Sequence, residues 1–323
     1  MWTYSFHGSR TVVRDETPAP VPDGLPDGTV LIRPLAGAIC GSDMAFYRGR
    51  VSPFHDAERA LAEDIPGFSL HEVVGEVVAA PGGEHAIGTR VVGWATGCDA
   101  LAELVVTRAS SVVPVTRDAP AVEVVSLQPL ACVIDVVKRL PRIAGARVAV
   151  VGLGPIGLLF AHVLKDAGAA HVVGVDPVDR SAVAGRFGLD ETVRTTAERW
   201  SRMLDDERPS VVVEAVGHQV GTLGECVRAV EPGGTVFYFG VPDDMVYPVA
   251  LDHMFRNSVT LMAGNVRDHA AALRAAISYR ERHPRVLTDL VSHTFDVHDA
   301  SAAYRLADTT SPERLKVVLD FTV

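Results

Sequence analysis

The chain has 323 residues, 48% of them hydrophobic, and a formal net charge of −10. This composition indicates a globular protein long enough for two domains and excludes a disordered chain. The negative charge argues against nucleic acid or an anionic membrane as a partner, and no run approaches the ~20 apolar residues that span a bilayer.

The cysteines suggest the compartment. Four are present, at positions 40, 98, 132 and 226, and they are too few and too scattered for a disulfide framework. The first residues lack the basic head and apolar stretch of a signal peptide. We therefore expect a cytoplasmic protein with reduced thiols.

The first part of the chain, up to about residue 127, has the pattern of short strands and turns. A region rich in proline and glycine at 15–27 predicts a surface turn. Short β segments at this spacing favour a partly closed barrel or a curled sheet. The strands are predicted at 29–34, 70–79, 90–93 and 101–106.

Candidate chemical residues adjoin two of these strands. Cys40 follows the first strand, and His71 and Glu72 lie in the second. A thiolate, an imidazole and a carboxylate oxygen are the ligand types that zinc prefers in open catalytic sites. Taken singly, Cys40 is more often a buried apolar residue and His71 a hydrogen-bonded core histidine, so both interpretations stay open at this point.

From about residue 129 the pattern changes to alternating strands and helices, which predicts a doubly wound parallel sheet. Its opening strand, 148–151, is an unbroken apolar run, as in strands buried on both faces. Further strands are predicted at 171–175, 210–216, 234–241 and 259–263, and helices at 181–187, 196–204 and 221–230.

A glycine-rich motif follows the opening strand. Gly152, Gly154 and Gly157 form G-x-G-x-x-G, and a helix is predicted to begin near Pro155 and Ile156. The first glycine permits a tight turn, the second lets a pyrophosphate approach the backbone, and the third lets the helix pack closely on its strand. The helix N-terminus offers N–H groups and a partial positive charge to the pyrophosphate. The motif predicts a dinucleotide site.

An acidic residue indicates which dinucleotide is bound. Asp176 ends the second strand of the sheet and lies 176 − 157 = 19 residues past the last glycine. A carboxylate at this distance can accept hydrogen bonds from the adenosine ribose and repels a 2′-phosphate, which favours NAD(H) over NADP(H). Arg180 can offset part of that repulsion. The alternative is an aspartate that only caps the turn before Pro177.

The last part of the chain contains a predicted helix at 268–282 and a strand-like segment at 315–321. We expect this tail to return to the first domain. The predicted domains are 1–128 together with 266–323, and 129–265.

Five motifs together show that the chain resembles the zinc-dependent medium-chain dehydrogenase/reductase superfamily, in its alcohol, sorbitol and threonine dehydrogenase branch. The resemblance covers nearly the whole length and implies an α/β protein with a Rossmann NAD-binding domain and a β-rich GroES-like catalytic domain. The motifs are ICGSD at 39–43, HEVVGEV at 71–77, QPLAC at 128–132, VGLGPIG at 151–157 and LKVVLDF at 315–321.

The resemblance also implies residue roles. Cys40, His71 and Glu72 would bind or adjoin one catalytic zinc ion, and Ser42 would take the proton of the substrate hydroxyl. Lys316 aligns with a basic residue that reaches the cofactor pyrophosphate. The residues expected to line the ribose and nicotinamide are Val216, Gly240 and Val241.

The implied activity is the NAD-dependent interconversion of a secondary alcohol and a ketone on a polar substrate such as a polyol, cyclitol or amino alcohol. Relatives pair their sixth sheet strands across a two-fold axis, so a homodimer or homotetramer is expected.

Departures from the family pattern bear on the zinc. Leu70 replaces the usual glycine before the His-Glu pair, and Gln128 replaces a glutamate that ligates or adjoins the metal. Ala45 replaces a histidine that relays the proton outward. The proton would then leave through the ribose hydroxyl and water, or through a residue of an insert, where His55 is the candidate. Only Cys98 lies where relatives carry a four-cysteine lobe, so no structural zinc is expected.

Three interpretations follow from these departures. The first is a dehydrogenase with one weakly held zinc ion. The second is a zinc-free reductase of the same fold, acting on an activated carbonyl or alkene. The third is an NAD(H)-binding protein without catalytic activity.

Overall fold

The computed structural model describes residues 1–49, 65–205, 207–242 and 244–322. They form two compact units. Unit 1 comprises Met1–Ala131 and Arg267–Val323, and unit 2 comprises Cys132–Val266. Unit 2 is therefore inserted into the sequence of unit 1. None of the helices in the described ranges is long and apolar enough to cross a membrane.

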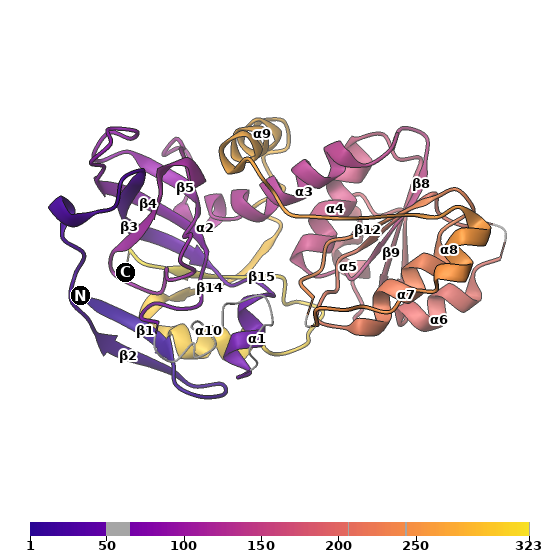
Figure 1. Ribbon diagram of the computed structural model, residues 1–323, viewed down its shortest axis with the longest axis horizontal. Helices are drawn as coiled ribbons and strands as arrows, with labels where there is room; N and C mark the ends of the chain where they lie inside the picture. Colours follow the sequence, from indigo (N-terminus) through magenta and orange to yellow (C-terminus); the bar gives the residue numbers. More distant parts are fainter. Residues whose placement is uncertain (50–64, 206, 243, 323) are drawn as a thin grey trace. The chain divides into compact units, whose positions relative to one another are not determined.

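Unit 1 is built on a seven-stranded sheet in the order β14-β15-β3-β4-β5-β7, with β6 paired to β3 (Figure 1). A separate hairpin joins β1 to β2. The strands are β1 Trp2–Phe6, β2 Val12–Glu16, β3 Thr29–Ala38, β4 Glu72–Ala79, β5 Arg90–Trp94, β6 Val105–Arg108, β7 Val112–Pro114, β14 Val291–Asp296 and β15 Lys316–Asp320. The helices that begin in this unit are α1 Asp43–Tyr47, α2 Ala121–Val124, α3 Leu127–Arg139, α9 His269–Arg282 and α10 Ala300–Ala307.

The C-terminal strand of unit 1 lies inside the sheet. Strand β15 pairs with β14 on one side and with β3 on the other. Its residues Lys316 to Leu319 are all buried, and Leu319 packs with Val30 and Ile32 of β3 in one hydrophobic core. Residues from the two ends of the chain thus form one sheet.

Unit 2 is a six-stranded parallel sheet in the order β10-β9-β8-β11-β12-β13. Helix α4 lies on one face, and α6 and α7 pack together on the other (Figure 1). The strands are β8 Arg147–Val151, β9 His171–Asp176, β10 Glu191–Arg194, β11 Val211–Glu214, β12 Thr235–Tyr238 and β13 Thr260–Ala263. The helices are α4 Pro155–Asp166, α5 Ser181–Ala184, α6 Ala197–Met203, α7 Val220–Ala229 and α8 Leu251–Asn257. The predicted doubly wound sheet is confirmed, with its change of direction between β8 and β11.

Some element predictions were wrong. The strand predicted at 70–79 begins at Glu72, so His71 precedes it. The strand predicted at 101–106 begins at Val105, because the backbone of Leu101 bonds to Gly67 and to Tyr4 of β1 instead of to a strand of the seven-stranded sheet. The sequence pattern missed several elements. Some are short or partly exposed, among them β1, β2, β7, β10 and α8. The helices α1, α2, α3 and α10 and the strand β14 were also not predicted.

Candidate active site

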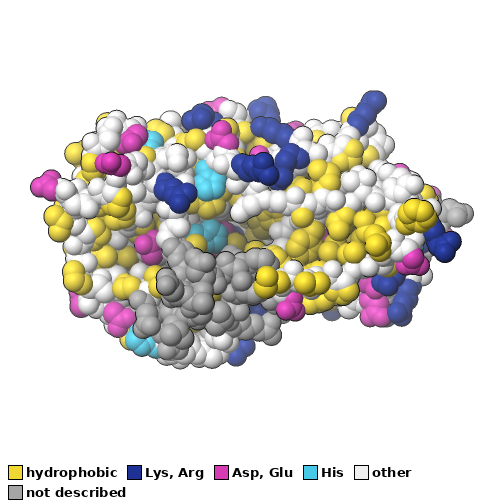
Figure 2. Space-filling view, viewed as in Figure 1, with side chains coloured by type: hydrophobic (Ala, Val, Ile, Leu, Met, Phe, Trp, Pro, Cys, Tyr) yellow, Lys and Arg dark blue, Asp and Glu magenta, His cyan; other side chains and the backbone are white. Residues whose placement is uncertain are grey.

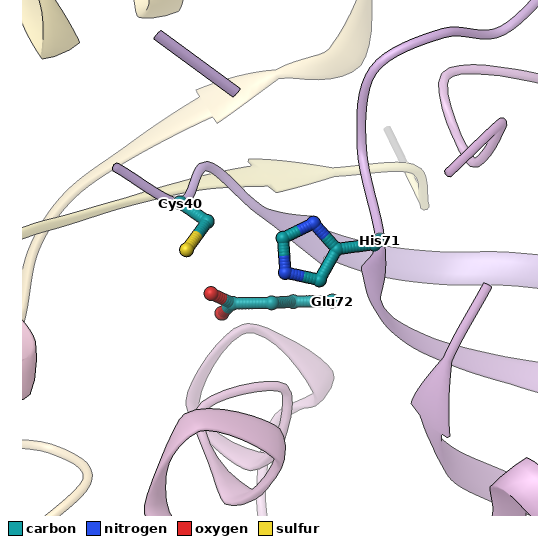
Figure 3. A group of neighbouring side chains, drawn as sticks. All are labelled: Cys40, His71 and Glu72. Atoms are coloured by element: carbon teal, nitrogen blue, oxygen red, sulfur yellow. The ribbon is translucent and has the colours of Figure 1, made fainter. Parts of the chain in front are cut away.

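Three potential metal ligands converge in unit 1. Cys40 follows β3, and His71 and Glu72 stand at the start of β4. Strands β3 and β4 are antiparallel neighbours with Ala38 opposite Glu72, so their pairing brings the two segments together. One ligand atom from each side chain lies within 4.8 Å of the others. Figure 3 shows the three side chains pointing toward one another.

The carboxylate of Glu72 is shared between a lysine and this group. Glu72 is fully buried, Lys316 is 2% exposed, and the Lys316 Nζ donates to Glu72 Oε1 at 2.5 Å. Burial opposes the charge on Lys316, but the negative groups around it, led by Glu72 and Cys40, raise its pKa. The second oxygen, Oε2, is buried and has no hydrogen-bond partner among the described residues. A free carboxylate oxygen beside a thiol and an imidazole fits a bound zinc ion.

An aspartate that the sequence analysis gave no role holds two of these ligands. Asp43 is 2% exposed, and its Oδ2 accepts from the backbone N–H of Cys40 at 2.8 Å. Its Oδ1 lies 3.3 Å from His71 Nδ1. Since a carboxylate only accepts, Nδ1–H donates and Nε2 keeps its lone pair for a metal. The sequence feature that could have indicated this role is the position of the aspartate in ICGSD, three residues after the cysteine.

The electrostatics of His71 reflect this arrangement. Burial opposes charge on the imidazole, but the Asp43 carboxylate and Cys40 together raise the pKa of His71 well above its ordinary value.

The other predicted residues of this site are placed as follows. Ser42 is half-buried and immediately precedes α1. Gln128 is 3% exposed in the first turn of α3. Leu70 is fully buried in the core, against Gly37 of β3. His55 lies outside the described residues.

The glycine motif adopts the geometry that its spacing predicts. Gly152 has φ +92°, which favours glycine. A Cβ added to Gly157 would lie 1.8 Å from the carbonyl oxygen of Gly152, whereas one added to Gly154 would meet no described atom within 4 Å. Pro155 begins α4, and Ile156 follows it. The fold requires the first and third glycines, while the second leaves open space for a ligand.

Asp176 is anchored to this loop. Its Oδ2 accepts from the N–H of Leu153 and its Oδ1 from that of Val178, each at 2.7 Å. Arg180 is 4% exposed. Burial lowers the pKa of Arg180, and the charge of Asp176 offsets part of this effect.

The structure brings together the residues expected at the ribose and nicotinamide. Val216 follows β11, and Gly240 and Val241 follow the neighbouring β12. The N–H of His218 donates to the carbonyl of Val241 at 2.8 Å. A Cβ on Gly240 would lie 2.3 Å from the backbone of Gly217, so the two turns are in close contact.

A buried glutamate that the sequence analysis missed shapes these turns. Glu214 is fully buried at the end of β11. Its Oε1 accepts from the N–H groups of Val216 and Gly217, each at 3.2 Å, and from the Thr222 hydroxyl at 2.8 Å. Burial raises the pKa of Glu214. The sequence feature that could have indicated this role is a single charged residue at the end of an otherwise apolar strand.

A surface cavity of about 360 Å³ adjoins the same part of unit 2. It lies at the start of α6 and α7, beside Thr222. The other lining residues are Thr196, Ala197, Glu198, Gln219, Gly221 and Glu225.

Comparisons with known proteins agree with the motifs. Residues 26–117 match the family model described as alcohol dehydrogenase GroES-like domain, and residues 155–278 match that of zinc-binding dehydrogenase. The chain is 25% identical over 317 residues to L-threonine 3-dehydrogenase of Bacillus velezensis, covering 89% of this chain and 90% of that protein. It is 24% identical over 328 residues to D-arabinitol dehydrogenase 1 of Uromyces fabae, covering 90% and 89%.

A solved structure supports the same fold. The protein described as a short chain alcohol dehydrogenase from Escherichia coli CFT073, complexed with cofactor NADH, superposes with a TM-score of 0.81. The two sequences are 20% identical, and the match covers 99% of both chains. The chain belongs to the zinc-dependent medium-chain dehydrogenase/reductase superfamily.

Proposed function

We propose that this dehydrogenase interconverts a secondary alcohol and a ketone on a polar substrate, using NAD(H) and one catalytic zinc ion. The observation that carries the proposal is the buried Glu72 Oε2, which lies beside Cys40 and His71 and has no hydrogen-bond partner in the part of the chain that the structure describes. The names of two relatives, a threonine and an arabinitol dehydrogenase, support an amino alcohol or a polyol as the substrate class.

Each residue has a defined part in the proposed mechanism. Cys40, His71 and Glu72 would hold the zinc ion, with Gln128 near it. In such a site the ion supplies a Lewis acid and NAD⁺ supplies the hydride acceptor. Ser42 accepts the proton of the substrate hydroxyl and gives its own to water. Asp43 keeps His71 oriented.

Metal content tests this proposal directly. Purified wild-type protein is expected to contain one zinc ion per chain by elemental analysis, and Cys40→Ser to contain none and to be inactive. Cys132→Ser, which changes a half-buried thiol in α3, is the control and is expected to retain zinc. Full activity in zinc-free wild-type protein would refute the proposal and favour the zinc-free reductase.

Gln128 offers a finer test of the same site. A carboxylate at this position would add a negative charge near the metal, so Gln128→Glu is expected to tighten zinc retention by about 10–100-fold. Unchanged zinc release to a chelator would remove Gln128 from the metal site.

We propose NAD(H) rather than NADP(H) because Asp176 places a fixed carboxylate at the dinucleotide loop. Asp176→Ala is expected to narrow the difference in kcat/KM between the cofactors by about 1–3 kcal/mol. Asp179→Ala, at an exposed acid three residues away, is the control. Equal or higher kcat/KM with NADPH in the wild type would contradict the proposal. Arg180 stays a predicted contributor to this preference.

We propose assembly as a homodimer or homotetramer through the edge of the unit 2 sheet. Strand β13 forms one edge of the sheet, and exposed apolar side chains lie near it in sequence. They include Met245, Val246, Leu251 and Phe255, whose exposed fractions run from 71% to 86%. Figure 2 shows hydrophobic side chains gathered on the surface of unit 2. Phe255→Glu is expected to give a monomer by light scattering, whereas Ile87→Glu in unit 1 is not. A monomeric wild type would refute assembly.

We also propose a cytoplasmic location, because the sequence has only four, widely spaced cysteines and no pattern of a disulfide framework.

A further inference from the structure

One buried tyrosine touches the backbone that carries the candidate metal ligands. Tyr304 lies on α10 and is fully buried. Its hydroxyl donates to the carbonyl oxygen of Ser69 at 2.6 Å, across 235 residues of sequence. Ser69 is 1% exposed and lies two residues before His71. The hydroxyl of Tyr304 therefore fixes the backbone just ahead of a candidate zinc ligand.

The contacts continue from Ser69 to the imidazole. The Ser69 hydroxyl donates to Asp43 Oδ1 over a long 3.4 Å, and the same oxygen accepts from His71 Nδ1 at 3.3 Å. The other oxygen of Asp43 holds the backbone of Cys40. Tyr304, Ser69 and Asp43 thus form a chain of polar contacts that reaches two of the three ligands.

The surroundings of Tyr304 keep it a donor. Its ring packs edge-to-face on Phe6, with centroids 5.1 Å apart, and against Tyr47 at 5.5 Å. Burial, followed by the charges of Asp43 and Cys40, raises the pKa of Tyr304 well above its ordinary value. The phenol therefore stays protonated. A phenylalanine would fill the same space, so packing alone does not explain the hydroxyl.

We propose that Tyr304 is a positioning residue for the metal site, acting through Ser69 and Asp43 on His71. This inference rests on the proposed zinc ion. Without the hydroxyl, the buried carbonyl of Ser69 loses its partner and the segment 69–71 shifts or gains mobility. The direct consequence is a less well oriented imidazole and a faster release of metal.

The experiment compares Tyr304→Phe with Tyr4→Phe. Tyr4 is 6% exposed in the same core, and its hydroxyl also makes one hydrogen bond, to His298 Nδ1 at 3.0 Å. Both variants lose one phenol hydroxyl, but only the first loses a contact with the site. Each full-length protein is loaded with cobalt(II), its visible absorption spectrum is recorded, and metal release to a chelator is timed.

We expect Tyr304→Phe to release cobalt about 10-fold or more faster than the wild type and to change the cobalt absorption bands. Tyr4→Phe is expected to match the wild type in both readouts, even where its melting temperature falls equally. Wild-type release and spectrum in Tyr304→Phe would overturn the inference and leave the zinc proposal standing. A wild type that takes up no cobalt would overturn both.

A second variant covers the case in which Tyr304→Phe does not fold. Ser69→Ala removes the next contact of the chain and leaves the carbonyl bond of Tyr304 in place. It is expected to accelerate cobalt release, and an unchanged release rate would overturn the inference.

Discussion

The two units contain candidate sites of opposite construction. In unit 1 the site is made of buried and half-buried ionisable side chains, with Glu72 between Lys316 and the group around Cys40. In unit 2 the dinucleotide loop is made of backbone, where Gly152, Gly154 and Gly157 supply shape by lacking side chains. The first site depends on residues that long-range strand pairing brings together. The second depends on a single turn between β8 and α4.

This difference predicts which kind of substitution disrupts each site. Removing a side chain should damage unit 1, because a charge or a proton acceptor is lost. Adding a side chain should damage unit 2, because space or a backbone conformation is lost. The following substitutions test this contrast.

The largest effect is expected from Ser42→Ala. Loss of a positioned proton-transfer group should lower kcat by about 100- to 10,000-fold, while zinc and NAD⁺ binding stay intact. Steady-state kinetics and cofactor titration measure the two properties. An unchanged kcat would remove Ser42 from the mechanism.

Lys316→Met is expected to come next. It leaves Glu72 buried and uncompensated, so the free energy of unfolding should fall by about 3–5 kcal/mol in urea denaturation. The double variant Lys316→Met, Glu72→Gln should recover most of this loss. Lys138→Met, at an exposed position on α3, is the control and should change little. A loss confined to cofactor affinity would instead support the role of Lys316 at the pyrophosphate that the family resemblance implies.

Adding a methyl group to Gly157 or to Gly154 distinguishes an effect on folding from an effect on cofactor binding in unit 2. Gly157→Ala forces a Cβ against the Gly152 carbonyl and should cost about 1–3 kcal/mol of stability. Gly154 has φ −69°, and an added Cβ would meet no described atom within 4 Å, so Gly154→Ala should fold normally. The added methyl group would occupy space that the ligand needs, so this variant should bind NAD⁺ more weakly. Thermal melting and cofactor titration distinguish the two. Equal melting temperatures for both variants would contradict the geometry.

The smallest effect concerns an ion-pair cluster in unit 1. Asp308 accepts from Arg10 Nε at 2.7 Å and from Arg48 Nε at 2.6 Å. Burial opposes its charge, but these bonds lower the pKa of Asp308 overall. Its stabilisation is therefore present above the ordinary aspartate pKa and is lost as pH falls through the lowered value. Asp308→Asn should cost about 1 kcal/mol near pH 7 and nothing in acid. If the stability difference between Asp308→Asn and the wild type did not change with pH, the charge of Asp308 would not be its cause.

The same contrast decides what the sequence could predict. The turn at Gly152 and the strand ending in Asp176 were predicted correctly, because strand, motif and helix are neighbours in sequence. The motifs also indicated that Cys40 and His71 lie close together. The contacts of Lys316 and Tyr304 could not be predicted, because they depend on which strand and which helix pack beside the site.

Glu214 and Asp43 were missed for a different reason. Nothing in the sequence distinguishes either residue from an acidic residue on the surface. In the structure each is buried, and each carboxylate accepts hydrogen bonds from more than one donor. Hydrogen-bond partners of this kind follow from the packing of a turn and not from the spacing of residues.

The insertion of unit 2 between the parts of unit 1 has a consequence for synthesis. Glu72 and Lys316 are separated by 244 residues. At about 5–20 residues per second, the ribosome delivers the lysine roughly 10–50 s after the glutamate. Throughout that interval the nascent chain holds β4 without β15, and the carboxylate lacks the cation that compensates its burial. The Rossmann sheet is complete in sequence before this, at Ala263. Unit 2 can therefore fold while translation continues, whereas unit 1 cannot complete its sheet until β15 has been synthesised.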